Sequence, residues 1–422
     1  MIRSGKHFLG FFLFLGLFFT NARNLHCIEK NAITRATEQV LLKFSDPISM
    51  RVFLNSSKAA EQLHPRLLWV ILRKHEGAKT LLKAFKNRIV HFENDTILKL
   101  EPEIKESPIK GMSKTWGIER VGAPEAWEKG LKGAGLIVAV VDTGVNRNHE
   151  GIRDNMWVNA SEQNGEAGVD DDKNGYIDDI HGYNFFANKN EPMDDHNHGS
   201  HVAGTIAGKH ASLGNIGVAP DAIIMAVKTH NRRGNGTKSG VVKGILYAVD
   251  NGARVMNCSW GGAPEAAEYS QLLFDAISYA NEKNVVLVAA AGNNSNNNDT
   301  KPVYPANYKV DNMLTVAATV YGSDNLAGFS NYGVKTVHVA APGSRIFSLS
   351  KSNGRYMNMS GTSMASPHVA GAAALAIEYL KKTQAEPVTP KMVRDLIMEK
   401  ATPVPGTENK VKTGIITVKT LD

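Results

Sequence analysis

Five apolar runs beyond residue 134, all rich in β-branched residues or alanine, constrain the fold most strongly. They are GLIVAVVDTG (135–144), AIIMAVKT (222–229), ARVMNCSW (253–260), NVVLVAAAGN (284–293) and NMLTVAAT (312–319). Short, continuously apolar runs of this kind are typical of strands that are buried on both faces. Helix-like stretches at 239–252, 266–284 and 364–382 lie between or after them. The alternation predicts an α/β fold, with a parallel sheet flanked by helices on both faces.

The N-terminus has the pattern of a signal peptide. Arg3 and Lys6 precede Phe8–Phe19, an unbroken apolar run of 12 residues, and the small residue Ala22 follows. Spanning a bilayer takes about 20 apolar residues, so the run is too short for a membrane anchor. A basic start, a short apolar middle and a small residue near the cleavage point predict a signal peptide over residues 1–22. The expected location is therefore secreted or periplasmic.

The net charge of +7 is concentrated in one part of the chain. Residues 1–110 carry 18 Lys or Arg and 10 Asp or Glu, which gives +8, and the remainder carries −1. Nucleic-acid binding is therefore not predicted, because the larger part of the chain has no excess of basic residues. The two cysteines, Cys27 and Cys258, are too few for a disulfide framework.

The basic segment at 23–110 predicts a small α/β domain in front of a larger one at 111–422. Strand-like runs occur at 39–44 (QVLLKF), 88–93 (RIVHFE) and 96–102 (TILKLEP), and a helix-like run occurs at 65–75 (PRLLWVILRKH).

Four polar residues stand where strands end or helices begin. Asp142 ends an apolar strand, where a buried carboxylate is costly without hydrogen bonds. Asn293 ends another strand, and His198 and Ser363 open helices of small residues. In parallel α/β folds, functional groups collect at the carboxyl ends of the strands.

These residues lie in four motifs that resemble, in order, those of the subtilisin-like serine peptidases. The motifs are DTG at Asp142, HGSHVAG at His198, AAGN ending at Asn293 and GTSMASPHVAG around Ser363, and the resemblance runs from about Trp116 to about Leu421. It implies that Ser363 is the nucleophile, His198 the general base and Asp142 the group that orients the base. It further implies that the Asn293 amide and the Ser363 N–H bind the oxyanion.

The resemblance also implies roles for the histidines of the stretch MDDHNHGSHVAG. His201 matches a histidine that helps pack the site, and His196, outside the motif, is expected to be solvent-exposed. A zinc site is the alternative. Zinc peptidase helices place two histidines four apart around a glutamate, whereas His198 and His201 are three apart with no glutamate between them.

The resemblance implies a secreted, self-processing serine endopeptidase that acts on proteins and peptides. Residues 23–110 would be its prodomain, which assists folding and blocks the cleft, with autocleavage between Pro102 and Lys114. An ordinary accessory domain is the alternative for that segment. For the whole chain, the alternatives are a catalytically silent family member acting as a calcium-dependent binding module, and a protease dedicated to one native substrate.

Two segments are expected to pair with an extended substrate as added strands. They contain the candidate substrate-binding residues Gly234, Gly236, Ser259, Trp260 and Gly261, and Asn294 is expected at the S1 pocket. No acidic residue falls on the S1 positions, where Val303 is also expected, so strict selection of Lys or Arg is not predicted. The family pattern further implies a cis peptide bond at Tyr304–Pro305.

The acidic stretch DDDKNGYIDDIHG (170–182) has the spacing of a calcium loop. The candidate ligands are Asp170, Asp172, Asn174, Tyr176 and Asp178. Position twelve, where an EF-hand carries a bidentate glutamate, is His181. A structural calcium ion is therefore predicted, and a solvated surface turn is the alternative.

Overall fold

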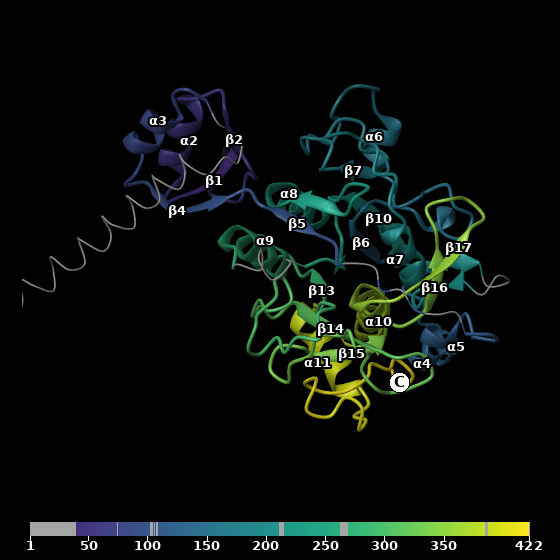
Figure 1. Ribbon diagram of the computed structural model, residues 1–422. Helices are drawn as coiled ribbons and strands as arrows, with labels where there is room; N and C mark the ends of the chain where they lie inside the picture. The colour runs from purple at the N-terminus through teal and green to yellow at the C-terminus, as the bar shows by residue number, and fades with distance from the viewer. Residues whose placement is uncertain are drawn as a thin grey trace, which may run out of the picture. The chain divides into compact units, whose positions relative to one another are not determined.

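The computed structural model describes residues 39–421 except 74, 102–103, 105, 107–108, 211–214, 262–268 and 385–386 (Figure 1). The expected signal peptide at 1–22 and Cys27 lie outside the described residues. The chain divides into two compact units, the first ending at Thr96 and the second beginning at Ile97. Among the helices of the described ranges, none combines the length and apolar character needed to cross a membrane.

The described part of the first unit is a small α/β fold, as predicted. Its elements are β1 (Gln39–Phe44), α2 (Pro47–Asn55), β2 (Ala60–Gln62), β3 (Trp69–Arg73), α3 (Ala78–Ala84) and β4 (Ile89–Asn94). The strands form an antiparallel sheet in the order β2-β3-β1-β4. Phe44, Phe53 and Leu72 are buried in the cluster between this sheet and its helices.

The prediction of a helix at 65–75 is wrong, because Trp69–Arg73 forms strand β3. This strand pairs with β1 on one side, where Val70 lies opposite Leu42, and with β2 on the other. The four residues Trp69–Leu72 are all buried and all apolar, so the strand lacks the alternation of apolar and polar residues that marks a half-buried strand. A short apolar run of this kind cannot be assigned to helix or strand from periodicity alone.

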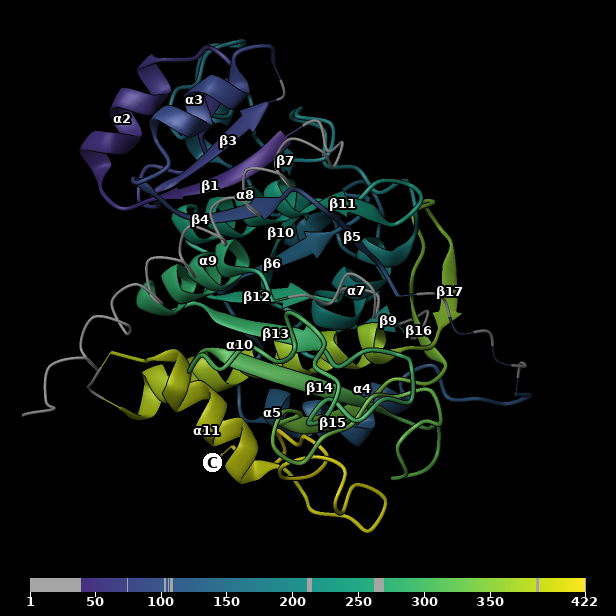
Figure 2. The same cartoon turned by 60° about the vertical axis from the view of Figure 1, so that its left-hand side comes forward.

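The second unit is built on a seven-stranded sheet in which every pair of neighbouring strands is parallel (Figure 2). In spatial order the strands are β15 (Val339–Pro342), β14 (Met313–Thr319), β13 (Val286–Ala290), β12 (Val255–Cys258), β6 (Ile137–Asp142), β10 (Ile223–Lys228) and β7 (Gly182–Asn184). The five inner strands are those predicted from the apolar runs. The two edge strands, β7 and β15, were not predicted.

Two pairs of helices cover opposite faces of this sheet, which confirms the predicted fold class. Helices α7 (His198–Ala207) and α10 (Thr362–Thr383) pack together, as do α8 (Lys238–Asp250) and α9 (Gln271–Glu282). In β10, Ile224 and Ala226 belong to the core cluster of α7 and α10. The intervening Val227 faces α8, where a Cβ on Gly244 would come within 2.9 Å of its Cγ1. Alternate residues of a strand point to opposite faces, so the two pairs lie on opposite sides.

Shorter elements complete the second unit. They are β5 (Ile97–Lys99), α4 (Trp116–Arg120), α5 (Ala123–Glu128), the 3-10 turn η1 (Arg153–Asn155), α6 (Ala160–Asn164), β8 (Lys209–His210), β9 (Asn215–Ile216), β11 (Asn235–Thr237), β16 (Ile346–Leu349), β17 (Tyr356–Met359) and α11 (Pro390–Lys400).

Candidate active site

A buried carboxylate and an imidazole meet at the carboxyl end of β6. Asp142 is the last residue of this strand and is fully buried. The Nδ1 of His198 lies 2.8 and 2.9 Å from the two carboxylate oxygens, and the Thr143 N–H donates to Oδ1 at 2.7 Å. Burial by itself would raise the pKa of Asp142, but the neighbouring His198 and His230 and the Thr143 N–H lower the pKa below its usual value. Asp142 is therefore held as a carboxylate against the ring of His198.

Asp194, which the sequence analysis missed, fixes the position of His198. His198 is the first residue of α7, and the chain before it makes a turn in which Asn197 has φ +115°. The Asp194 carboxylate accepts the N–H groups of His196 and Asn197 at 2.8 and 3.1 Å and that of Ser200 at 3.0 Å. It also accepts the Thr143 hydroxyl at 2.9 Å. A carboxylate at a helix N-terminus is stabilising, and here it ties α7 to the residue that follows Asp142.

The Ser363 hydroxyl lies one strand away from Asp142. Ser363 is the second residue of α10, and its Oγ donates to the carbonyl of Ser259 at 2.9 Å. Ser259 follows the end of β12. The parallel register pairs Asn257 with Val140, and continuing it by two residues would place Ser259 beside Asp142. Neighbouring strands are about 4.8 Å apart. The hydrogen bond between Ser363 and His198 stays a prediction; such bonds often tighten only when substrate binds.

Two hydrogen-bond donors converge beside Ser363. Asn293 Oδ1 accepts the Thr362 N–H and hydroxyl, both at 2.9 Å, which orients the Asn293 amide. A Cβ placed on Gly361 would lie 3.2 Å from Asn293 Nδ2 and 3.6 Å from the Ser363 nitrogen. Glycine at 361 therefore keeps open the space that these two donors border. The arrangement can stabilise a negatively charged oxygen.

Two further histidines of the stretch before and within α7, His201 and His196, are buried or partly buried. His201 is fully buried, its Nε2 lies 2.9 Å from the Ile346 carbonyl oxygen, and burial lowers its pKa to about 3. His196 is partly buried, contrary to the expectation that it is solvent-exposed. Its ring centroid lies 6.3 Å from that of His198, and burial lowers its pKa. Within the described ranges, these histidines do not gather into a metal-binding group with other ligating side chains.

An extended segment of this chain lies between the two predicted substrate-pairing segments. Strand β5 is antiparallel to β11, with Leu98 opposite Gly236, and the Leu100 N–H donates to the Gly234 carbonyl at 2.8 Å. On the other side, Lys99 forms an antiparallel bridge with Gly261.

Continuing the register of that bridge by two residues places Glu101 opposite Ser259, the residue bonded to Ser363. A Cβ on Gly261 would lie 3.4 Å from Val303 Cγ1 and 3.8 Å from Glu101 Oε1, so the Glu101 carboxyl is close to the predicted S1 residue Val303. In the described part of the chain, Glu101 Oε1 is buried without a hydrogen-bond partner, and burial raises the pKa of this carboxyl.

The remaining predictions for the S1 pocket and the cleft concern the Tyr304–Pro305 bond, Trp260 and Asn294. The Tyr304–Pro305 peptide bond is cis, as expected. The Trp260 side chain is buried and its indole N–H donates to the Val141 carbonyl at 2.9 Å, so only its backbone is left to contact a substrate. Asn294 is exposed, and its N–H donates to Asn331 Oδ1 at 2.9 Å.

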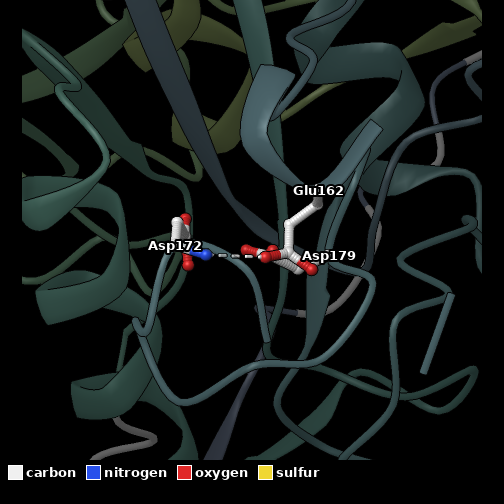
Figure 3. Close-up of side chains that lie close together, drawn as sticks. All are labelled: Glu162, Asp172 and Asp179. Carbon is white, nitrogen blue, oxygen red and sulfur yellow. Dashed lines mark hydrogen bonds between the residues drawn. The ribbon is translucent and has the colours of Figure 1, made fainter. Parts of the chain in front are cut away.

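An acidic cluster forms beside the predicted calcium loop, with a composition that the sequence analysis found only in part (Figure 3). Carboxylate oxygens of Glu162, Asp172 and Asp179 lie within 4.8 Å of one another. Asp172 belongs to the predicted set, whereas Glu162 comes from α6 and Asp179 follows the predicted ligand Asp178. Asn174 donates its side-chain amide to Asp172 and Asp179, both at 3.0 Å.

Asp170 and Asp178 take part in other hydrogen bonds, and Tyr176, at the position where an EF-hand supplies a backbone carbonyl, stays a predicted ligand. Asp170 accepts the Asn174 N–H at 3.0 Å and the Gly175 N–H at 2.9 Å, so it closes the loop turn. Both oxygens of Asp178 accept the Gly168 N–H, and the Tyr176 ring packs against aromatic neighbours, including Tyr183 at 4.6 Å. Even so, the three clustered carboxylates are hard oxygen donors of the kind that suits calcium.

The chain resembles known proteases in both sequence and structure. Residues 133–415 match the model of the subtilase family. Thermitase of Thermoactinomyces vulgaris is 39% identical over 62% of this chain and 82% of its own length. Subtilisin-like protease 1 of Plasmodium berghei is 30% identical over 79% of this chain, which spans 58% of that protein.

A solved structure gives the same result. Fervidolysin of Fervidobacterium pennivorans, a keratinolytic enzyme related to subtilisin, matches with a TM-score of 0.71 and 27% identity over 92% of this chain and 61% of its own. The family match covers more than half of the chain, and the fold of the chain agrees with that of an enzyme related to subtilisin whose structure is known. The chain therefore belongs to the subtilase family of serine endopeptidases.

Proposed function

We propose that this chain is an exported, self-processing endopeptidase that hydrolyses peptide bonds through Ser363, His198 and Asp142. The observation that carries the proposal is the His198–Asp142 pair, at 2.8 Å, one strand away from a serine hydroxyl held at a helix N-terminus. A serine hydroxyl is a weak nucleophile unless a base lies within hydrogen-bond reach, and this arrangement can supply one.

In this mechanism, Ser363 Oγ attacks the scissile carbonyl while His198 Nε2 takes the hydroxyl proton. Asp142 keeps the proton of His198 on Nδ1 and stabilises the imidazolium that forms. The Asn293 amide and the Ser363 N–H donate to the oxyanion of the tetrahedral intermediate. His198 then passes its proton to the leaving amine. In deacylation, His198 takes a proton from water, the water oxygen attacks the acyl carbon, and His198 returns the proton to Ser363 Oγ as the carboxylic acid leaves.

The position of Ile97–Leu100 supports a mainly backbone mode of substrate binding. We propose that substrates pair with Gly234, Gly236 and the 259–261 segment as this stretch of the chain does. A substrate residue opposite Ser259 would then enter the pocket near Val303 and Asn294. Pairing through main-chain groups accepts many sequences, so selectivity depends on the pockets for alternate side chains.

We further propose that residues 23–110 are a prodomain and that residues 1–22 direct export. Continued to Glu101, the register of Lys99 with Gly261 would present the bond that follows Glu101 to Ser363. Proline has no N–H and carries its ring on the nitrogen, which makes this bond a poor substrate. Processing within Pro102–Lys114 therefore requires the segment to move out of this register first. The prodomain would be released from the cleft only after that step.

We propose calcium as a structural ion held by Glu162, Asp172 and Asp179. Glu162 also accepts the Asp171 and Asp172 N–H groups, at 2.8 and 3.1 Å, so an ion here would join α6 to the loop. The ion would neutralise three carboxylates that otherwise repel one another.

Removing calcium is expected to lower the melting temperature by several degrees, because a ligand at 100 times its Kd stabilises the folded state by about 2.7 kcal/mol. Melting curves in calcium and in chelator, taken on the Ser363→Ala protein to prevent self-digestion, measure this. Asp172→Asn should abolish most of the difference. Asp154→Asn, at a side chain 75% exposed outside the cluster, should leave it intact. Identical curves in calcium and chelator would return the loop to the surface-turn alternative.

The endopeptidase function itself is tested with the purified full-length chain and an unfolded protein such as casein. We expect internal cleavage that stops when a fluorophosphonate is added. A folded, fully processed chain that leaves casein intact and also fails on a diverse peptide library would contradict the function.

A further inference from the structure

The side chains of Ser344, Arg345 and Ser360 form a partly buried polar pocket that binds the carboxylate of Glu106. The Ser344 hydroxyl lies 2.9 and 2.8 Å from the two oxygens of Glu106, and Arg345 Nη1 donates to Oε1 at 3.0 Å. The Ser360 hydroxyl donates to Oε2 while accepting the Arg345 N–H at 2.7 Å. A single carboxylate is thus bound by three side chains that lie far from it in sequence.

The pocket is part of the framework that holds the nucleophile. Ser360 precedes Ser363 by three residues, and the Gly361 N–H donates to the Gly343 carbonyl at 2.8 Å. The Ser344 N–H donates in turn to the Thr319 carbonyl at 3.1 Å, at the carboxyl end of β14. The pocket therefore lies on the same edge of the sheet as Asp142 and Ser259.

The direction of the chain places this pocket on the leaving-group side of the site. Ile97–Leu100 pairs with the cleft segments, and continuing the register of Lys99 with Gly261 by two residues would place Glu101 opposite Ser259, which is hydrogen-bonded to Ser363. Glu106 comes five residues later in the direction of the chain. A substrate bound in the same direction would bring the fifth residue after its scissile bond to the pocket.

The chemistry of the pocket selects an anion. Ser344 is fully buried and Ser360 is 5% exposed, and the Arg345 side chain is 19% exposed. If the partner carboxylate were replaced by an apolar group, these donors would lose hydrogen bonds that water can restore only in part. Charge-assisted hydrogen bonds from a guanidinium and hydroxyls to a carboxylate are among the stronger polar contacts in proteins.

We propose that Ser344, Arg345 and Ser360 form a carboxylate-binding subsite, which Glu106 fills in the precursor. After processing, the subsite receives a glutamate five residues beyond the bond to be cut. The proposal rests on the endopeptidase function and adds a substrate class to it, namely proteins that carry an acidic side chain on the leaving-group side. Because Glu106 competes for the same subsite, its release is part of activation.

Two peptides test the subsite. Both carry the sequence of residues 97–110 with alanine in place of Pro102, so that the bond after Glu101 becomes an ordinary amide. One peptide keeps the glutamate of position 106 and the other carries glutamine. We expect the processed protein to cut the glutamate peptide with a kcat/KM higher by about tenfold or more. In the Arg345→Gln protein the two peptides should be cut at nearly equal rates. Ser360→Ala, assayed in parallel, should also reduce the ratio of kcat/KM for the glutamate peptide to kcat/KM for the glutamine peptide.

Arg153→Gln is the matched control, because it removes one positive charge at a side chain that is 62% exposed and outside the pocket. This variant should keep the preference for glutamate. Equal cleavage of both peptides by the unsubstituted protein would overturn the subsite while leaving the endopeptidase function intact. An unchanged preference in Arg345→Gln would also overturn it. Failure to cut either peptide by protein that does cut casein would overturn the binding register on which the subsite rests, whereas failure on casein as well would overturn the endopeptidase function.

Discussion

Replacing Ser363 by alanine is expected to leave the exported chain as an uncut precursor and to lower kcat on added substrates by about 10⁶; this magnitude is the one known for subtilisin and does not come from the present structure. The hydroxyl is the atom that bonds to the scissile carbonyl in the proposed mechanism, so His198 and Asp142 alone cannot form an acyl-enzyme. The variant should fold, because the change removes one oxygen whose hydrogen bond is to the Ser259 carbonyl. Gel analysis and N-terminal sequencing of the exported protein measure the outcome.

The matched control is Ser352→Ala, a serine-to-alanine change at an exposed position. It should be processed and active like the unsubstituted chain. A processed N-terminus in Ser363→Ala, produced in a host without other export proteases, would show that Ser363 is not required for cleavage.

Asp142→Asn is expected to lower kcat by about 10⁴ with a much smaller effect on KM, the magnitude found for the same substitution in a serine-protease triad. The asparagine amide can accept a hydrogen bond from the His198 Nδ1–H only if its oxygen faces the ring. If its NH₂ group faces the ring, Nδ1 becomes the acceptor and Nε2 keeps its proton. In that tautomer His198 cannot accept the proton of Ser363. Steady-state kinetics on a peptide substrate measures the loss.

The lowered pKa of Asp142 determines how its contribution to folding stability is expected to depend on pH. Because this pKa is lowered in the folded state, the carboxylate contributes stability above its unfolded value of about 3.9, and that contribution is lost as the pH falls through the folded value. Asp142 therefore stays ionised at neutral pH. Asp154→Asn is the control for loss of a surface charge and should retain full activity. Equal activity of Asp142→Asn and the unsubstituted protein would contradict the proposed role.

The sequence predicted the interior of the large sheet well and its margins poorly. The five inner strands are predominantly apolar because helices cover both of their faces, so their composition reveals their burial. The edge strands β7 and β15 are three and four residues long, and β7 (Gly182–Asn184) lacks any apolar run. The strand Trp69–Arg73 was assigned to a helix because burial of both of its faces removes the alternation that marks a strand.

The candidate site also contains residues that the sequence could identify and residues that it could not. Residues inside contiguous motifs, such as Asp142 and His198, could be proposed from the sequence because each motif carries its own local structure. Glu162 and Glu106 could not, because they lie outside these motifs and their partners come from other segments. Asp194 also lies outside the motifs, although most of its partners are local, at 196, 197 and 200. An acidic residue just before a helix start is a signal that could have identified Asp194. No comparable local signal marks Glu106, whose partners at 344–360 lie more than 230 residues away.

The central claim is that Ser363 is a nucleophile activated by His198 and Asp142, and trapping that nucleophile tests it most directly. Purified, processed protein is treated with a fluorophosphonate, digested, and mapped by mass spectrometry. We predict a single phosphonylated residue, Ser363, formed at the rate at which activity is lost and formed far more slowly in Asp142→Asn. An adduct on another residue, or full peptidase activity with no adduct at Ser363, would contradict the claim.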